Sequence, residues 1–271
     1  MQFKEQEKLL KIAQKAAYSA GLEIMQIYNQ LQLDIEYKED KSPLTQADKA
    51  AHSIILDFLK NTDIPIISEE GEIPDYQIRK NWEYCWLVDP LDGTKEFIKR
   101  NGEFTVNIAL IENGNPIIGV IFIPVMNSMY FSSNNKSFFI ENISPDISLV
   151  EFERSLVEGS KRLPMQKESN CYRILASRSH INYETKSYIE KLKAENQNIE
   201  IFNIGSSLKF CMIAAGKANI YPRFSPTMEW DTAAGHAIII AAGGKVIDMK
   251  SGLDLNYNKE NLVNPWFIAK I

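Results

Sequence analysis

The fold and the chemistry of this chain both depend on one stretch, Trp86-Leu87-Val88-Asp89-Pro90-Leu91-Asp92-Gly93-Thr94. Its apolar first part predicts the end of a buried strand. Because proline cannot donate a hydrogen bond to a sheet, we expect the strand to end at Asp89-Pro90. Gly93 then permits a tight turn, after which a helix is expected to begin near Thr94.

The same stretch brings several oxygen atoms close together. We expect the side chains of Asp89, Asp92 and Thr94, with a backbone carbonyl turned inward, to share one loop. Two neighbouring carboxylates repel each other and ionise readily only beside a cation. Mg2+ takes oxygen ligands in octahedral geometry at roughly 2.0–2.1 Å. The stretch therefore indicates a metal site, although Asp-Pro and Asp-Gly also occur in ordinary polar turns.

The overall composition is that of a soluble globular protein. The chain has 271 residues, of which 45 % are hydrophobic and 24 % charged, and this length suits one large domain or two medium ones. The formal net charge is -5 and the pI about 5.4, whereas proteins that bind nucleic-acid polymers carry a basic surface. We therefore exclude a general nucleic-acid binder but not a local basic pocket for a small phosphorylated molecule.

The three cysteines are far apart and contain no C-x-x-C pair, which indicates reduced thiols and a reducing compartment. Neither the cysteines nor the three histidines have the spacing of a zinc site. Neither a secretory leader nor an apolar run long enough to cross a membrane is evident, so we expect a cytoplasmic protein. Any metal would then be bound by oxygen. The residues concerned are Cys85, Cys171, Cys211, His52, His180 and His236.

The first part of the chain predicts two helices and a strand. Residues 5–30 have the apolar spacing of an amphipathic helix. Their alanine-rich side favours core packing, but it leaves open a homodimer or peripheral contact with the cytoplasmic face of the inner membrane. Thr45 and Asp48 form a capping-box pattern that predicts a second helix through about Lys60. The apolar segment 64–68 predicts a strand that ends at Glu69 and Glu70.

The remaining pattern predicts a layered fold in two halves. Residues 1–150 form an antiparallel-sheet α+β half and residues 151–271 an alternating α/β half, with a seam around 150–172. Residues 132–170 show no site signal. Strands are expected at 106–111, 116–123, 129–131, 173–177, 200–204, 218–221, 245–248 and 266–269, and helices at 183–195, from 207 through Ala215, and from Trp230 through Ala242.

Four acidic residues are candidates for one cluster. Glu69 and Asp89 follow predicted strands, where α/β sheets place ligands, and Asp231 begins a predicted helix. With Asp92 they would form a site that tolerates its charge only with divalent metal. Two Mg2+ ions roughly 3.5–4 Å apart could hold and polarise a phosphate there. Taken singly, Asp231 is better explained as an ordinary N-cap, and Glu69 with Glu70 is at least as well explained as part of a solvated loop.

Several long motifs together resemble the inositol monophosphatase superfamily. Its three signatures resemble Ser68-Glu69-Glu70, the stretch from Asp89 to Thr94, and Trp230-Asp231-Thr232-Ala233-Ala234-Gly235. The segment Asp40-x-Ser42-Pro43-x-Thr45-x-Ala47-Asp48 matches its N-terminal motif. The runs 86–110, 205–211 and 221–224 are similar to its bisphosphate nucleotidase branch. The resemblance covers nearly the whole chain and is weakest at 132–170.

The resemblance implies a fold, a metal site and a set of catalytic residues. The fold would be an αβαβα sandwich like that of inositol monophosphatase. One Mg2+ would be held by Glu69, Asp89 and the carbonyl of Leu91, and a second by Asp89, Asp92 and Asp231. The residues that position the attacking water would be Asp48, Glu69 and Thr94, with a third, weaker ion near Asp48. Gly93 and Thr94 would meet the scissile phosphate at a helix start.

The resemblance also implies the substrate, adenosine 3',5'-bisphosphate, cut at its 3'-phosphate to give AMP. Its sulfated relative is a second candidate, and the role would be in sulfur assimilation, with Li+ inhibition. Lys209 and Arg223 would supply positive charge for the second phosphate, although Lys209 could also lie on a solvated helix face and His180 could be an N-cap. The full substrate-binding set is Leu91, Asp92, Gly93, Thr94, Ser177, His180, Gly205, Ser206, Ser207, Lys209, Arg223 and Asp231.

Three other functions are open on the sequence. An inositol monophosphatase-type sugar phosphatase would share every metal ligand. A haloacid-dehalogenase-type phosphatase would use D-x-D-G-T with a nucleophilic aspartate, but here two residues, Pro90 and Leu91, separate Asp89 from Asp92, which disfavours that chemistry. A metal-dependent binding protein without turnover is the third, and the intact acidic set argues against it.

Overall fold

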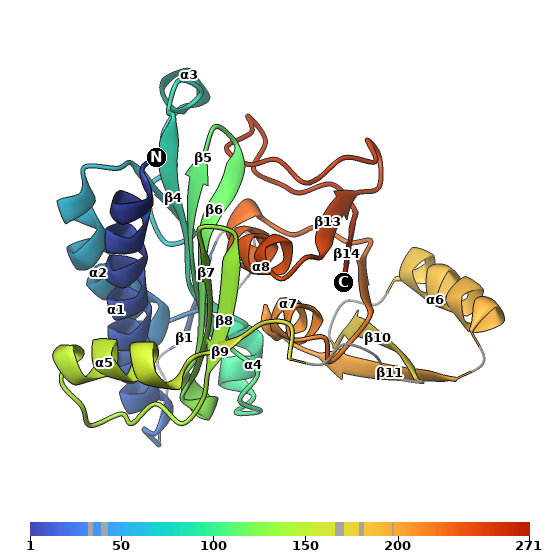
Figure 1. The fold of residues 1–271 in the computed structure, drawn as a ribbon, viewed down its shortest axis with the longest axis horizontal. Coiled ribbons are helices and arrows are strands. Elements are labelled where there is room, and N and C mark those ends of the chain that lie inside the picture. Colours follow the sequence, from blue (N-terminus) through green and yellow to red (C-terminus); the bar gives the residue numbers. More distant parts are fainter. Residues whose placement is uncertain (32–34, 39–42, 166–170, 179–181, 197) are drawn as a thin grey trace.

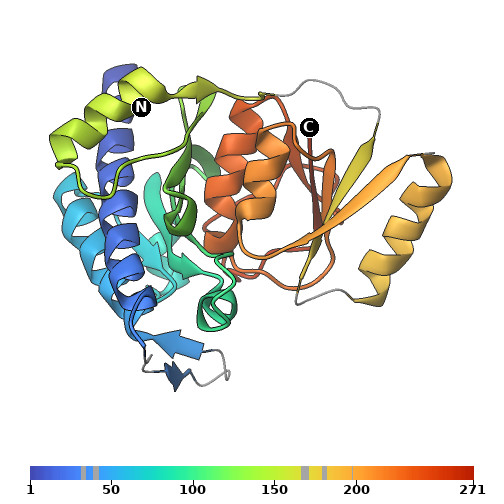
Figure 2. The same cartoon turned by 90° about the horizontal axis from the view of Figure 1, so that it is seen from below.

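Two β-sheets lie next to each other, with helices packed between them and outside them (Figure 1). The computed structural model describes residues 1–31, 35–38, 43–165, 171–178, 182–196 and 198–271. From one side to the other, the layers are α1 with α2, the first sheet, α7 with α8, the second sheet, and α6 (Figures 1 and 2). This is the αβαβα order that the family resemblance implies.

The first sheet has seven strands in the order β3-β4-β5-β6-β7-β8-β9. The β3–β4 pair is parallel and the others are antiparallel. Because β3 and β4 run in the same direction, the last residues of both strands lie at the same end of the sheet. The strands are Ile66–Ser68, Tyr84–Asp92, Thr105–Glu112, Asn115–Ile123, Ser128–Ser133, Lys136–Ile140 and Lys161–Arg162.

Helices α1 (Phe3–Tyr28), α2 (Gln46–Leu59) and α5 (Leu149–Gly159) cover the outer side of this sheet. The alanine-rich side of α1 is buried, as its spacing predicts. Thr45 is the N-cap of α2, and its capping box with Asp48 is formed. Before α2, the short strands β1 (Ile35–Tyr37) and β2 (Pro43–Thr45) pair antiparallel.

Helices α7 (Leu208–Ala214) and α8 (Glu229–Ala241) fill the space between the sheets. Helix α8 is buried around almost its whole circumference and lies close to β6. A Cβ added to Gly119 of β6 would lie 2.3 Å from the Ala234 carbonyl oxygen. Only glycine permits this approach, which brings the middle of α8 close to the first sheet.

The second sheet has the strand order β11-β10-β12-β14-β13. Strand β10 is parallel to β11 and β12, and β14 is antiparallel to β12 and β13. Helix α6 (Tyr183–Glu195) packs on its outer side. In sheet order, the strands are Ile199–Ile204, Tyr172–Ser177, Ile220–Arg223, Phe267–Lys270 and Lys245–Asp248.

The expected end of the strand at Asp89-Pro90 is wrong, because β4 continues through Pro90 to Asp92. Asp89 pairs with Asn107 and Asp92 with Thr105, so the register shifts by one extra residue in β4. Such a bulge takes up a proline without a ladder hydrogen bond. The chain then enters the short helix α4 (Thr94–Ile98), as the glycine predicts.

Two smaller differences from the sequence pattern concern helices and strands that it does not predict. Residues 132–165 contain the end of β7 and all of β8, α5 and β9, the last of which extends the first sheet to Arg162. A one-turn helix, α3 (Tyr76–Arg79), precedes β4. Among the described residues, none of the helices has the length and apolar character that crossing a membrane requires.

Candidate active site

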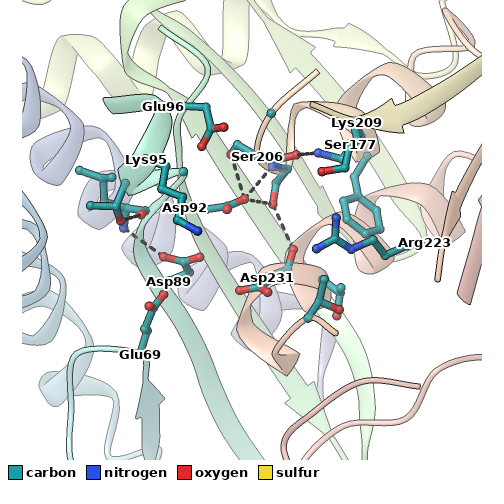
Figure 3. A pocket seen from close by; sticks show the side chains of 18 of the residues that line it. Glu69, Asp89, Asp92, Lys95, Glu96, Ser177, Ser206, Lys209, Arg223 and Asp231 are labelled. Atoms are coloured by element: carbon teal, nitrogen blue, oxygen red, sulfur yellow. Dashed lines mark hydrogen bonds between the residues drawn. The ribbon is translucent and has the colours of Figure 1, made fainter. Parts of the chain in front are cut away.

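A cavity of about 310 Å3 lies where the end of β4, the turn after β11 and the start of α8 meet (Figure 3). The two halves of the chain both line it. The first half contributes Glu69, Asp89 and the residues from Leu91 to Glu96. The second contributes Ser177, Gly205, Ser206, Ser207, Lys209, Arg223 and Asp231.

Three carboxylates meet at one end of this cavity. One oxygen each from Glu69, Asp89 and Asp231 lies within 4.8 Å of the other two. Glu69 and Asp89 arrive together because β3 and β4 are parallel neighbours. Asp231 comes from the first turn of α8, where its Oδ2 also accepts from the Met228 amide at 2.8 Å. Asp231 is therefore both a helix-capping residue and a member of the acidic cluster.

Burial and mutual repulsion shift the pKa values of this cluster upward. The pKa of Asp89 is raised well above its usual value, first by burial and then by the charges of Glu69, Asp92 and Asp231. The pKa of Asp231 is raised by burial and by Asp92 and Glu69. Buried carboxylates of this kind are stabilised in their charged form by a cation. An all-oxygen donor set fits a hard divalent ion such as Mg2+.

Asp92 is held differently from the other three carboxylates. Its Oδ2 accepts from Ser206 Oγ at 2.8 Å, from the Ser207 amide at 2.6 Å and from Ser207 Oγ at 2.7 Å. Asn107 Nδ2 lies 3.4 Å from the same atom. One oxygen of Asp92 is thus directed to the second half of the chain, and the side chain connects the two halves across the cavity.

Asp48 and Thr94 form a hydrogen-bonded pair. Thr94 Oγ1 donates to Asp48 Oδ1 at 3.0 Å and lies 3.3 Å from the Leu91 carbonyl oxygen. The other oxygen of Asp48 accepts from the amide and the hydroxyl of Thr45 at 2.7 and 2.5 Å. Burial raises the pKa of Asp48, and the hydrogen bonds from Thr45 and Thr94 oppose this shift. The residue thus combines a helix-capping role with contact to the site.

Gly93 makes this geometry possible. Its φ of 95° is in the region that favours glycine, and an added Cβ would lie 2.8 Å from the Glu103 carbonyl oxygen. Any other residue would move the turn that places Thr94 beside Asp48.

A lysine that the sequence analysis did not single out contacts the acidic end. Lys38 Nζ lies 2.9 Å from Glu69 Oε1 and 2.6 Å from Glu70 Oε1. Burial raises the pKa of Glu69 and Lys38 opposes that shift. Burial by itself would lower the pKa of Lys38, but the two glutamates raise it overall. No spacing in the sequence connects Lys38 with Glu69, because the two residues are 31 positions apart.

The other end of the cavity carries positive charge. Arg223 points its guanidinium into the cavity (Figure 3), with Nη2 donating to the Pro226 carbonyl at 3.2 Å. Its Nε is buried without a hydrogen-bond partner among the residues that the structure describes. Lys209 is only 4 % exposed, and burial lowers its pKa to about 8. Ser177 lies on the same side, whereas His180 falls outside the described residues.

Further residues at or beside the cavity are Glu103, Lys95 and Glu96, whose contacts were not predicted, and Arg178, which the family resemblance places in the nucleotide half of the site. Glu103 pairs with Arg178 through bonds of 2.8 and 2.6 Å and accepts from the Gly205 amide at 2.7 Å. Lys95 and Glu96 line the cavity near Asp92. Lys95, Glu96 and Glu103 lie in the run 86–110, and Gly205 lies in the run 205–211. The similarity of these two runs to bisphosphate nucleotidases was the available signal.

Comparison with known proteins now identifies the family. The sequence model of the inositol monophosphatase family matches residues 5–269. The chain belongs to the inositol monophosphatase family. Members of this family are metal-dependent phosphatases that generally use Mg2+, in agreement with the acidic cluster of Glu69, Asp89 and Asp231.

Within this family, curated relatives carry the name 3'(2'),5'-bisphosphate nucleotidase CysQ. The Shigella flexneri protein is 46 % identical over 94 % of this chain and 96 % of its own length. CysQ of Escherichia coli strain K12 is 45 % identical with the same coverage. The crystal structure of CysQ from Bacteroides thetaiotaomicron superposes with a TM-score of 0.88 at 47 % identity, covering 98 % of this chain and 97 % of that one.

Proposed function

We propose that this protein is a Mg2+-dependent 3'(2'),5'-bisphosphate nucleotidase that hydrolyses the 3'-phosphate of adenosine 3',5'-bisphosphate to give AMP and phosphate. The observation that carries the proposal is one cavity with a carboxylate cluster at one end and Lys209 and Arg223 at the other. A substrate with two separated phosphates fits this division of charge. The names of the relatives support the same reaction.

The acidic end would hold two Mg2+ ions. One would be bound by Glu69, Asp89 and the carbonyl of Leu91, and the other by Asp89, Asp92 and Asp231, with room for a third near Asp48. When bound, such ions neutralise the charge of the scissile phosphate and activate water. Asp89 would belong to both sets, which agrees with its position at the centre of the repulsive cluster.

Thr94 and Asp48 would accept the proton that the attacking water loses. The Thr94 hydroxyl donates its proton to Asp48 at 3.0 Å, so its lone pairs are free to accept from a water molecule. Asp48 then draws the proton away through this contact as a general base. Burial raises the pKa of Asp48, which makes its carboxylate a stronger base. Glu69, in the neighbouring carboxylate cluster, would orient the same water.

The basic end would select the nucleotide. The buried Nε of Arg223 lacks a partner among the described residues, and arginine binds phosphate oxygens through two adjacent N–H groups. Ser177 and the Gly205–Ser207 turn would line the nucleoside between the two ends, together with His180. The sulfated relative of the substrate has its second acidic group in the same place and would bind in the same way.

An inositol monophosphatase-type activity on sugar phosphates is the alternative. Such a substrate has one phosphate and does not require Lys209 and Arg223 at a second position. The three cysteines are free and buried, as is usual in a reducing compartment such as the cytoplasm. A role in sulfur assimilation rests on the names of the relatives alone. A homodimer and peripheral membrane contact stay predictions.

The decisive experiment measures phosphate release from adenosine 3',5'-bisphosphate with Mg2+, for the natural protein and Asp89→Asn in parallel. We expect rapid release by the natural protein and a loss of at least about 1000-fold in the variant, because the shared ligand of both ions is changed. Inositol 1-phosphate is the comparison substrate. A higher kcat/KM for inositol 1-phosphate would reject the nucleotidase assignment in favour of the alternative.

A further inference from the structure

The turn between β11 and α7 carries the contacts that hold Asp92. Ser206 and Ser207 supply three hydrogen bonds to one carboxylate oxygen, at 2.8, 2.6 and 2.7 Å. Ser206 has a φ of 53°, which is uncommon for a residue with a side chain. Such a conformation persists only where the surrounding contacts hold it. The turn therefore needs supports, and the structure contains two.

Lys209 is the first support. Its Nζ donates to the Ser206 carbonyl at 2.6 Å and to the Ile204 carbonyl at 3.1 Å, so one ammonium group connects the end of β11 with the strained residue. The ammonium also lies 5.2 Å from the centre of the Tyr221 ring. An ammonium has three N–H donors, and two are used within the protein. Only the third is left for a substrate.

Glu103 is the second support. It accepts from the Gly205 amide at 2.7 Å and is itself held by Arg178. A Cβ on Gly205 would lie 2.9 Å from Glu96 Cγ and 3.0 Å from Glu103 Oε2. The turn is thus fixed on one side by the first half of the chain and on the other by Lys209.

We propose that Lys209 is a positioning residue: by holding the carbonyls of Ile204 and Ser206 it fixes the turn that orients Asp92 as a metal ligand. This inference rests on the proposed function for the role of Asp92, but it gives Lys209 a task other than binding the second phosphate. Groups that orient a metal ligand typically change metal affinity or activity by about 10- to 100-fold when they are removed. Lys209→Met is expected to have an effect of that size.

The two tasks of Lys209 predict different results for a substrate without the 5'-phosphate. If Lys209 only contacts that phosphate, Lys209→Met lowers kcat/KM for adenosine 3',5'-bisphosphate and leaves adenosine 3'-phosphate unchanged. If Lys209 positions Asp92, the variant loses about 10- to 100-fold on both substrates. It also binds Mg2+ more weakly in the absence of any substrate.

The experiment is a calorimetric titration of the substrate-free protein with Mg2+, followed by kcat/KM for both nucleotides. The variants are Lys209→Met and, as a matched control, Lys191→Met on the exposed face of α6. We expect weaker Mg2+ binding and a parallel loss on both substrates for Lys209→Met, and no change for the control. Unchanged Mg2+ affinity, with a loss confined to the bisphosphate, would overturn the inference.

Ser207→Ala provides an independent readout if Lys209→Met does not fold. This variant keeps Lys209 and removes one donor to Asp92, so Mg2+ affinity is expected to fall, and unchanged affinity contradicts the inference. In a folded double variant, the loss of Mg2+ binding free energy should be smaller than the sum of the losses in the two single variants, because both substitutions act through Asp92. The calorimetric result does not involve a nucleotide. A protein that binds Mg2+ as expected but cleaves neither nucleotide would therefore refute the proposed function alone.

Discussion

The backbone turn at Gly93 gives the hydroxyl group of Thr94 a defined orientation. The turn at Gly93 places this hydroxyl 3.0 Å from Asp48, a residue more than forty positions earlier in the chain. A hydroxyl has a single proton, and here Asp48 accepts it. The oxygen then presents lone pairs to the cavity, where they can accept a hydrogen bond from water.

Thr94→Val removes this hydroxyl and nearly conserves the shape of the side chain. We expect kcat to fall by about 100- to 10,000-fold, the usual contribution of general acid–base catalysis, because Asp48 can no longer take up the water's proton. Thr94→Ser keeps the hydroxyl and should keep most of the activity. The measurement is kcat with saturating Mg2+. Equal rates for the valine and serine variants would exclude this role for Thr94.

Individual site residues could be predicted where they are close in sequence. Asp89, Asp92 and Thr94 lie within one short segment, and the bulge in β4 turns them to the same cavity. Lys38 and Arg178 could not be predicted in this way. Their contacts with Glu69 and Glu103 join residues far apart in the chain, and short-range spacing has no information about such pairs.

Most helices and strands lie where the local sequence pattern predicts them, whereas the bulge in β4 does not. The capping box of α2 and the glycines after α8 are local signals, and both helices form where these signals lie. Strand β4 passes its proline because β5 continues to pair with it on the other side of the bulge. Pairing with a neighbour therefore overrode the local tendency of Pro90 to end a strand.

Helix α8 depends on close contact with β6 for its position. A Cβ at Gly119 would lie 2.3 Å from a backbone oxygen and 2.9 Å from Ala237 Cβ. Neither atom can move without displacing the helix. The helix begins at the turn that carries Asp231, so an error in its position is transmitted to the metal cluster.

Gly119→Ala should therefore destabilise the protein by about 1–3 kcal/mol, the usual cost of overpacking. This corresponds to a decrease in Tm of roughly 2–4 °C per kcal/mol. Gly159→Ala is the matched control, because its new Cβ would meet the end of a flexible Ile140 side chain at 3.1 Å. Thermal unfolding of both variants is the measurement. A Gly119→Ala protein as stable as the control would show that the helix can shift without cost.

The complete molecule places acidic groups from both halves around one cavity. Glu69, Asp89 and Asp92 come from the first sheet, and Asp231 comes from the helix between the sheets. The order of strands in the two sheets, which brings them together, could be anticipated only through the resemblance to a family. The folded chain concentrates negative charge that the unfolded chain would spread out, so protons and divalent ions are both expected to affect stability.

Without divalent ions, this cluster should make the protein less stable as the pH rises. Burial raises the folded-state pKa values of Asp89 and Asp231 above their unfolded values of about 3.9. A group whose pKa is raised by folding makes its full contribution to the free energy of unfolding below its unfolded pKa. That contribution is lost as the pH rises through its folded pKa. Asp89→Asn removes one of these two groups. In the presence of a chelator, its advantage in Tm over the natural protein should therefore increase from pH 4 upward.

Mg2+ should reverse this effect in the natural protein, because it binds the ionised, folded cluster and not the unfolded chain. At a concentration of 100 times Kd, a single site adds about 2.7 kcal/mol, and we expect Tm to rise with Mg2+ concentration at pH 7. Asp89→Asn should respond much less. NaCl at matched ionic strength separates specific binding from screening. If NaCl raised Tm as much as Mg2+ does, the cluster would be a region of diffuse charge without a bound ion.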